Sequence, residues 1–132
     1  MHTRAWRWLV LLFLISIATH SAGFSNQKYK TENQEIMLSG KLTLETYLDA
    51  NDEPEKSFIL YSDKAIGVLE DKFGGPSSNV KKIQLVLMEK KDIAKAKNLI
   101  NKKIRVVGTL FYGFSAHHHT DVLITVMKIE GL

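Results

Sequence analysis

Three consecutive histidines are the residues of this 132-residue chain whose types and spacing most clearly allow chemistry. His117, His118 and His119 are followed by Thr120 and Asp121. In an extended backbone His117, His119 and Asp121 project to one face, because successive side chains alternate, while His118 and Thr120 project to the other. Neutral imidazole and carboxylate groups are ligands of zinc, copper and nickel. The spacing therefore raises the hypothesis of a Zn, Cu or Ni site.

A structural role for the same histidines is the alternative that we favour. Side chains two apart on a strand are separated by about 7 Å, so a tight metal site needs a ligand from a second element. The sequence offers no second histidine cluster and no cysteine. An imidazole can instead form a hydrogen bond at each ring nitrogen and fix a loop, while Thr120 and Asp121 satisfy nearby amides. We therefore expect a loop-fixing role, with metal binding as the second hypothesis and no cofactor required.

Sequence signals for catalysis are weak. The chain has no cysteine nucleophile, and Ser115 lies near His117 without the sharp turn that exposes an activated serine. The glycine-rich stretch DKFGGPSS, residues 71–78, lacks the lysine position and the helix of a phosphate-binding loop. We therefore expect that the protein is not an enzyme.

Aromatic residues beside the histidines indicate a binding surface instead. Phe111, Tyr112 and Phe114 precede the histidines, and Thr120 follows them. Loops at the mouth of a small barrel often bind ligands, although such aromatic residues can equally belong to the core and its rim. We expect a non-catalytic module that binds a protein or cell-envelope partner. An inhibitor or immunity protein against an exported toxin is one form of this function.

The amino terminus has the composition of a secretory signal peptide. Arg4 and Arg7 precede an unbroken apolar run from Trp8 to Ala18, which is short for a bilayer span of about 20 residues. The sequence predicts a signal peptide over residues 1–23, cut between residues 18 and 23, with membrane contact only through this segment if it is uncleaved. A chain without cysteine is unlike a disulfide-bonded animal secretory domain. We therefore expect export to the bacterial periplasm or the extracellular space.

The charge of the chain does not favour nucleic acid as a partner. Loss of Arg4 and Arg7 with the signal peptide reduces the 18 Lys+Arg residues to 16, against 14 Asp+Glu. The lysines are dispersed as pairs between apolar runs, whereas a nucleic-acid site needs basic residues clustered on one face. Binding of nucleic acid is therefore not expected.

Hydrophobic patterns predict the elements that hold these residues. Residues 24–33 are polar and aperiodic, as in a flexible arm. From Glu35 onward, apolar residues at every second position predict a long strand bent at Gly40. A strand over residues 57–62 with a brief hairpin partner follows, and then a loop over residues 71–79.

The second half of the chain predicts strand, helix, strand and strand. Residues 81–89 alternate as a strand, and Asp92 is a predicted cap for a short helix that ends near Asn101. Two strands then flank the histidines, and the last one, residues 121–130, is apolar on both faces and is therefore expected to be central.

This order predicts a fold over residues 34–131. A mainly β domain with one short helix between its third and fourth strands is typical of a small OB-like five-stranded barrel, here placed after an amino-terminal signal peptide. An open α+β sandwich is the alternative. We prefer the barrel because strands bent at glycines are what closure requires.

A family resemblance is carried by the carboxy-terminal third. The segment NKKIRVVGTLFYGFSAHHHTDVLITVMKIE, with VKKIQLVL before it, resembles the end of a family of small exported bacterial domains of unknown function. The shared pattern is a GTLF strand, a loop ending in HHHT and an apolar strand. The resemblance covers roughly residues 34–130 and is most specific over residues 80–127. It implies an exported OB-like domain, and it implies no activity.

Overall fold

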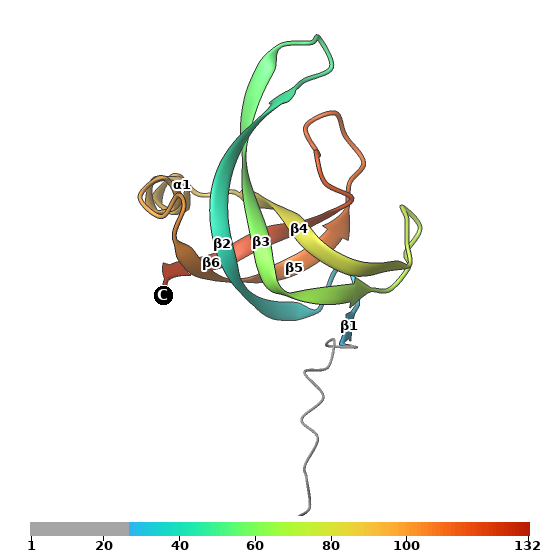
Figure 1. The fold of residues 1–132 in the computed structure, drawn as a ribbon. Coiled ribbons are helices and arrows are strands. Elements are labelled where there is room, and N and C mark those ends of the chain that lie inside the picture. Colours follow the sequence, from blue (N-terminus) through green and yellow to red (C-terminus); the bar gives the residue numbers. More distant parts are fainter. Residues whose placement is uncertain (1–26) are drawn as a thin grey trace, which may run out of the picture.

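A computed structural model describes residues 27–132, which form a strongly curved β-sheet and one helix (Figure 1). The strands are β1 (Lys28–Tyr29), β2 (Glu35–Leu48), β3 (Pro54–Val68), β4 (Ser77–Leu87), β5 (Lys103–Tyr112) and β6 (Val122–Gly131). Helix α1 (Lys90–Lys97) lies between β4 and β5 in the chain. The prediction of a mainly β protein with one short helix is confirmed. The predicted signal peptide lies outside the described residues, as do residues 24–26 of the predicted arm.

The five long strands each have two long neighbours in the sheet. Strand β3 pairs antiparallel with β2 and β4, and β5 pairs antiparallel with β2 and β6. The remaining pairing, β4 with β6, is parallel. Strand β6 therefore lies between β5 and β4, which confirms the central position predicted from its two apolar faces.

The core is built by the alternation of apolar residues that the sequence predicts. Ile36, Leu38 and Leu42 point inward from β2, and burying each contributes about 1.5 to 3 kcal/mol. Gly40 continues this inward face at a point where the neighbouring strand comes very close. A methyl group added at Gly40 would lie 2.0 Å from the carbonyl oxygen of Tyr61, so a side chain there is sterically excluded.

Two strands are longer than the sequence predicts. Residues 54–68 form the single strand β3, whereas a strand over residues 57–62 and a separate hairpin partner were expected. A shift in register between Tyr61 and Ile66 bends β3 without ending it. Strand β4 starts at Ser77, inside the predicted loop over residues 71–79, because the backbone there pairs with the end of β3.

The helix begins two residues before the predicted cap. Glu89 is its N-cap and makes no side-chain capping bond, while Asp92 lies in the first turn and is buried. The amides of Asp92 and Ile93 both donate to the carbonyl oxygen of Glu89, which places Asp92 inside the helix. Asp92 is therefore not the cap, although its charge is favourable near the positive end of the helix dipole.

Part of the predicted flexible arm is paired with the sheet. Lys28 and Tyr29 form β1, which runs parallel to the end of β3 opposite Gly67 and Val68. The amide of Glu32 donates to the carbonyl oxygen of Leu110 at 3.0 Å. Residues 28–32 are thus held by backbone hydrogen bonds. Across residues 27–132, helix α1 is too short and too polar to cross a membrane.

Candidate functional site

The three histidines lie on the loop between β5 and β6, residues 113–121, which we call the histidine loop. This loop rises at the same end of the sheet as the hairpin tip that joins β2 to β3 (Figure 1). The tip is shaped by Asp49, whose carboxylate accepts the amides of Asn51 and Glu53 at 2.8 and 3.0 Å. These two amide bonds, Glu53 first, lower the pKa of Asp49. The hairpin tip and the histidine loop are therefore neighbouring segments, each with a defined backbone.

Glu55 connects the hairpin to two of the histidines. One oxygen of its carboxylate lies 2.8 Å from Nδ1 of His117, and the other hydrogen-bonds Nε2 of His119. Hydrogen bonds from His117 first, and from His119 second, hold the pKa of Glu55 below its ordinary value. The carboxylate thus remains ionised in the structure and accepts a bond from each ring.

Tyr47 covers the second of these histidines. The rings of Tyr47 and His119 stack with centroids 4.4 Å apart and planes 2° from parallel. The side chain of His119 is only 9% exposed, whereas that of His117 is 72% exposed. His119 is therefore a packed part of the junction, and His117 borders solvent.

Gln84 fixes the backbone of the histidine loop from β4. Its side-chain amide donates to the carbonyl oxygen of His117 at 2.9 Å, and its side-chain oxygen accepts the amide of His119 at 2.7 Å. Its backbone amide donates to Oγ1 of Thr120 at 3.0 Å. Because Gln84 is 7% exposed, these bonds form away from solvent, where an unpaired polar group is costly. One residue of β4 therefore sets the position of residues 117–120.

His118 fixes the loop from within. Its Nδ1 accepts the backbone amides of Phe114 and Ser115 at 3.0 and 3.2 Å, so that nitrogen carries no proton. Burial, followed by the charges of His117 and His119, lowers the pKa of His118. The rings of Phe111 and Phe114 contact the ring of His118 edge-on, with centroids 5.3 and 4.8 Å from its centroid. His118 therefore connects two parts of the histidine loop through hydrogen bonds to the loop backbone.

The three residues predicted to form a metal-binding face do not come together in the structure. His117 and His119 converge on Glu55, while Asp121 is exposed and its backbone oxygen accepts the amide of Gly113. Each imidazole bonds a different oxygen of Glu55. Within residues 27–132, no group of three or more histidine and acidic side chains is arranged to hold a metal ion.

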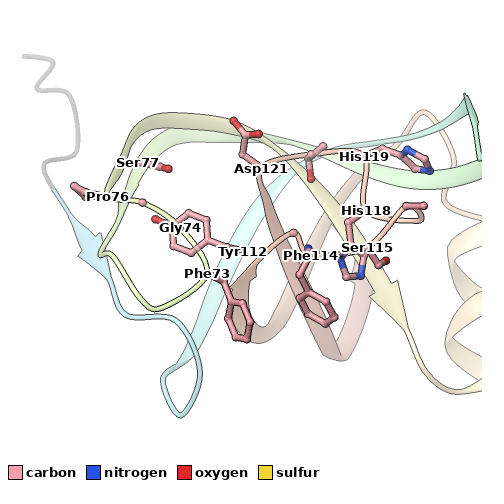
Figure 2. Close-up of a pocket in the computed structure, with 14 residues that line it drawn as sticks. Phe73, Gly74, Pro76, Ser77, Tyr112, Phe114, Ser115, His118, His119 and Asp121 are labelled. Carbon is pink, nitrogen blue, oxygen red and sulfur yellow. Dashed lines mark hydrogen bonds between the residues drawn. The ribbon is translucent and has the colours of Figure 1, made fainter. Parts of the chain in front are cut away.

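A cleft opens beside the histidine loop. It has a volume of about 710 Å³ and lies between residues 73–77 on one side and the histidine loop on the other (Figure 2). We call it the mouth cleft. Phe73 and Phe114 stand at its border, 50% and 68% exposed, with ring centroids 5.6 Å apart. Gly75, at φ +83°, brings its backbone so close that a methyl group there would lie 2.1 Å from the hydroxyl of Tyr112.

The four residues predicted as a binding surface occupy different environments. Phe114 is exposed, and Phe111 is half-buried against His118. Tyr112 is 4% exposed and belongs to the core, with its hydroxyl donating to the carbonyl oxygen of Val68 at 3.0 Å. Thr120 is used internally, because its hydroxyl accepts from Gln84 and donates to Val122. Of the four, Phe114 presents the most surface to a ligand.

Sequence reasoning missed Tyr47, Glu55 and Gln84. Tyr47 and Glu55 lie 72 and 64 residues before His119, in segments that read as a strand end and a turn. Gln84 carried a detectable signal, since it is a glutamine inside the apolar run IQLVL at a position that β4 buries. A polar residue in such a run is expected to have a specific hydrogen-bonding partner.

The comparisons with known proteins bear on the part of the chain that holds this site. A family model described as Domain of unknown function (DUF4431) matches residues 82–130, which include Gln84 and the whole histidine loop. No curated protein matches the chain. The carboxy-terminal part of the chain is therefore similar to a small domain of unknown function.

Proposed function

We propose that the protein is an exported, non-catalytic binding module with an OB-like barrel fold, and that its ligand binds in the mouth cleft. The partner is a protein or another component of the bacterial cell envelope. The observation that carries this proposal is the cleft of about 710 Å³, bordered by the exposed rings of Phe73 and Phe114. Exposed aromatic rings at a concave site are typical of binding surfaces.

The strand arrangement supports the OB-like fold. Pairing proceeds in the cycle β2, β3, β4, β6, β5 and back to β2, with the helix between β4 and β5. In OB folds the loops corresponding to the β2–β3 tip and the histidine loop commonly contact the ligand. This comparison concerns architecture, and it gives no ligand class by itself.

The contacts around the histidines support a binding role because they shape the cleft wall. Tyr47 of β2, Glu55 of β3 and Gln84 of β4 hold the histidine loop from three other strands. A loop held in this way presents Phe114 with little ordering cost when a ligand arrives. Export rests on the signal-like segment over residues 1–23 and on the absence of cysteine.

Capture from an envelope extract tests this proposal. Immobilised mature protein is compared with the double variant Phe73→Ala/Phe114→Ala and with the control Met37→Ala/Met127→Ala. Met37 and Met127, each 59% exposed, are also large exposed apolar residues and do not line the mouth cleft. We expect a specific envelope component that the wild type and the methionine control retain and the phenylalanine variant loses. Equal recovery by all three proteins would contradict the cleft as the binding site.

A further inference from the structure

We propose that the free edge of β4, residues 77–82, binds an extended acidic peptide segment by strand addition. This inference rests on the proposed function, because the edge borders the mouth cleft and the inference names the class of partner. Strand addition supplies main-chain hydrogen bonds for affinity, while neighbouring side chains select the sequence.

The first observation is that β4 is paired on one side only in its amino-terminal half. Residues 84–87 pair in parallel with residues 123–126 of β6. Before Gln84 the two segments diverge, since the chain ahead of β6 is the histidine loop. Within residues 27–132, no strand pairs with residues 77–83 on the side that faces β6.

The second observation is the direction of the backbone groups along this edge. The amide of Gln84 points toward the histidine loop, where it donates to Oγ1 of Thr120. Backbone groups of alternate residues in a strand point to the same edge, so those of Val80 and Lys82 point there too. A row of such groups is a template for an added strand.

The third observation is that space exists beside the edge. A second cleft, of about 460 Å³, is lined on one side by residues 77–82 and on the other by residues 119–122. It shares Ser77, His119, Thr120 and Asp121 with the mouth cleft, so the two clefts adjoin. Asn79 has φ +54°, and the register with β3 shifts on either side of Val80, so the regular part of the edge begins at Val80 and is the part that an added strand can pair with.

Charge selects the occupant. Lys81 and Lys82 are exposed neighbours on this edge, and Lys82 already lies 3.6 Å from the carboxylate of Glu45, while Lys81 has no acidic partner within ion-pair distance among residues 27–132. Opposite charges across paired strands attract, and like charges directly opposite repel. Two copies of β4 paired edge to edge would bring their lysines together. Asp121 is exposed on the opposite wall of this cleft, so Lys81 and Lys82 on the β4 side are the groups that favour an acidic peptide over a second copy of this chain.

The test uses wild-type protein and blocked hexapeptides of alternating glutamate and valine, followed by amide NMR. We expect the amides of Val80 and Lys82 to shift and to exchange more slowly on titration. Two N-methylated peptides serve as matched probes, one methylated at every glutamate and one at every valine. Because one set of amides faces β4 and the other faces away, one methylated peptide should lose binding and the other should keep it.

Charge reversal gives the second arm. Lys81→Glu should weaken the acidic peptide about 3- to 10-fold and strengthen its lysine–valine counterpart. Lys97→Glu is the control, since Lys97 is an exposed lysine at the end of α1, away from the edge. Unchanged amides of Val80 and Lys82 at saturating peptide, or equal binding of both methylated peptides, would overturn the inference.

The outcome separates this inference from the proposed function. If the envelope component depends on Phe73 and Phe114 while the peptide leaves β4 unaffected, the cleft proposal stands and the strand-addition inference fails. If the peptide binds the edge of β4 and no envelope component is retained, the strand-addition inference stands and the cleft proposal fails. A soluble peptidoglycan glycan fragment that shifts the cleft amides in place of the peptide also counts against strand addition.

Discussion

His119 stacks face to face on Tyr47, with ring centroids 4.4 Å apart and planes within 2° of parallel. This contact joins the end of β2 to the histidine loop across 72 residues of sequence. Together with the bonds of Glu55 and Gln84, it determines where the loop lies over the sheet. The stability of the loop can therefore be tested one contact at a time.

Removal of the Tyr47 ring should destabilise the protein more than removal of its hydroxyl. Stacked aromatic pairs contribute about 0.5 to 1.5 kcal/mol beyond the area they bury, so Tyr47→Ala should lower the free energy of unfolding by about 2 kcal/mol. The buried hydroxyl lies beside the Lys82 ammonium and raises the pKa of that lysine, but it makes no well-formed hydrogen bond among residues 27–132, so Tyr47→Phe should cost less than Tyr47→Ala. Urea unfolding followed by circular dichroism measures both. A Tyr47→Phe variant as unstable as Tyr47→Ala would show that the hydroxyl, and not the stack, matters.

Gln84 should be the most sensitive of the loop contacts. Gln84→Leu leaves the amide of His119 and the carbonyl of His117 without their buried partner, at a cost of about 2 to 4 kcal/mol. Gln84→Glu is the matched control, because it keeps an acceptor for His119 and loses the donor to His117. Hydrogen exchange at the His119 amide should rise strongly in Gln84→Leu and less in Gln84→Glu. Unchanged exchange in both variants would contradict the assigned role.

Glu55 makes stability depend on pH at the acidic end. Its pKa is lowered in the folded state, so its contribution is complete above the unfolded value of about 4.3 and is lost as pH falls through the lower folded value. The stability advantage of wild type over Glu55→Gln should therefore shrink as pH falls below about 4.3. Thermal unfolding of both proteins between pH 3 and 7 measures it. An advantage that grows on acidification would contradict the lowered pKa.

His118 should add a second acid-sensitive step at higher pH. Its pKa is lowered by burial, so its contribution is complete above the unfolded value of about 6.5 and declines as pH falls toward the folded value. His118→Ala removes the acceptor for two amides and should cost about 1 to 2 kcal/mol at neutral pH. His118→Asn tests whether an acceptor without titration restores stability. The pH dependence of stability below 6.5 should weaken in both variants. If it persists unchanged, a group other than His118 causes it.

A metal titration separates the two hypotheses for His117 and His119. Because the two rings bond separate oxygens of Glu55, we expect zinc or copper to bind wild type no more tightly than His117→Ala/His119→Ala. Isothermal titration calorimetry measures this directly. Clearly tighter binding by wild type would favour the Zn, Cu or Ni site, with Asp121→Ala and Glu55→Gln then identifying the third ligand.

Much of the secondary structure of this protein could be predicted from local sequence patterns. Alternation of apolar residues predicted β2 and β5, because a strand with one buried face must repeat every two residues, and a run that is apolar on both faces predicted β6. The short helix and a long strand that contains Gly40 were also predicted, although the helix begins at Lys90 and Asp92 is not its cap. The histidine run itself was visible in the sequence, but the extended backbone assumed for it is a loop with turns and bends in the structure.

What only the tertiary structure decided is which residues meet those histidines. Glu55 and Tyr47 reach the histidine loop because β2 and β3 extend past the sheet and fold over its mouth, and no local periodicity encodes that proximity. The sequence left Tyr112 open between the binding surface and the core, and the structure packs it inward because the strand alternation of β5 continues to its last residue. The free edge of β4 could not be predicted from the sequence either. Whether that edge is paired depends on where the distant histidine loop leaves the sheet. Sequence determined the local conformations and the chemistry available, and long-range packing determined which groups came into contact.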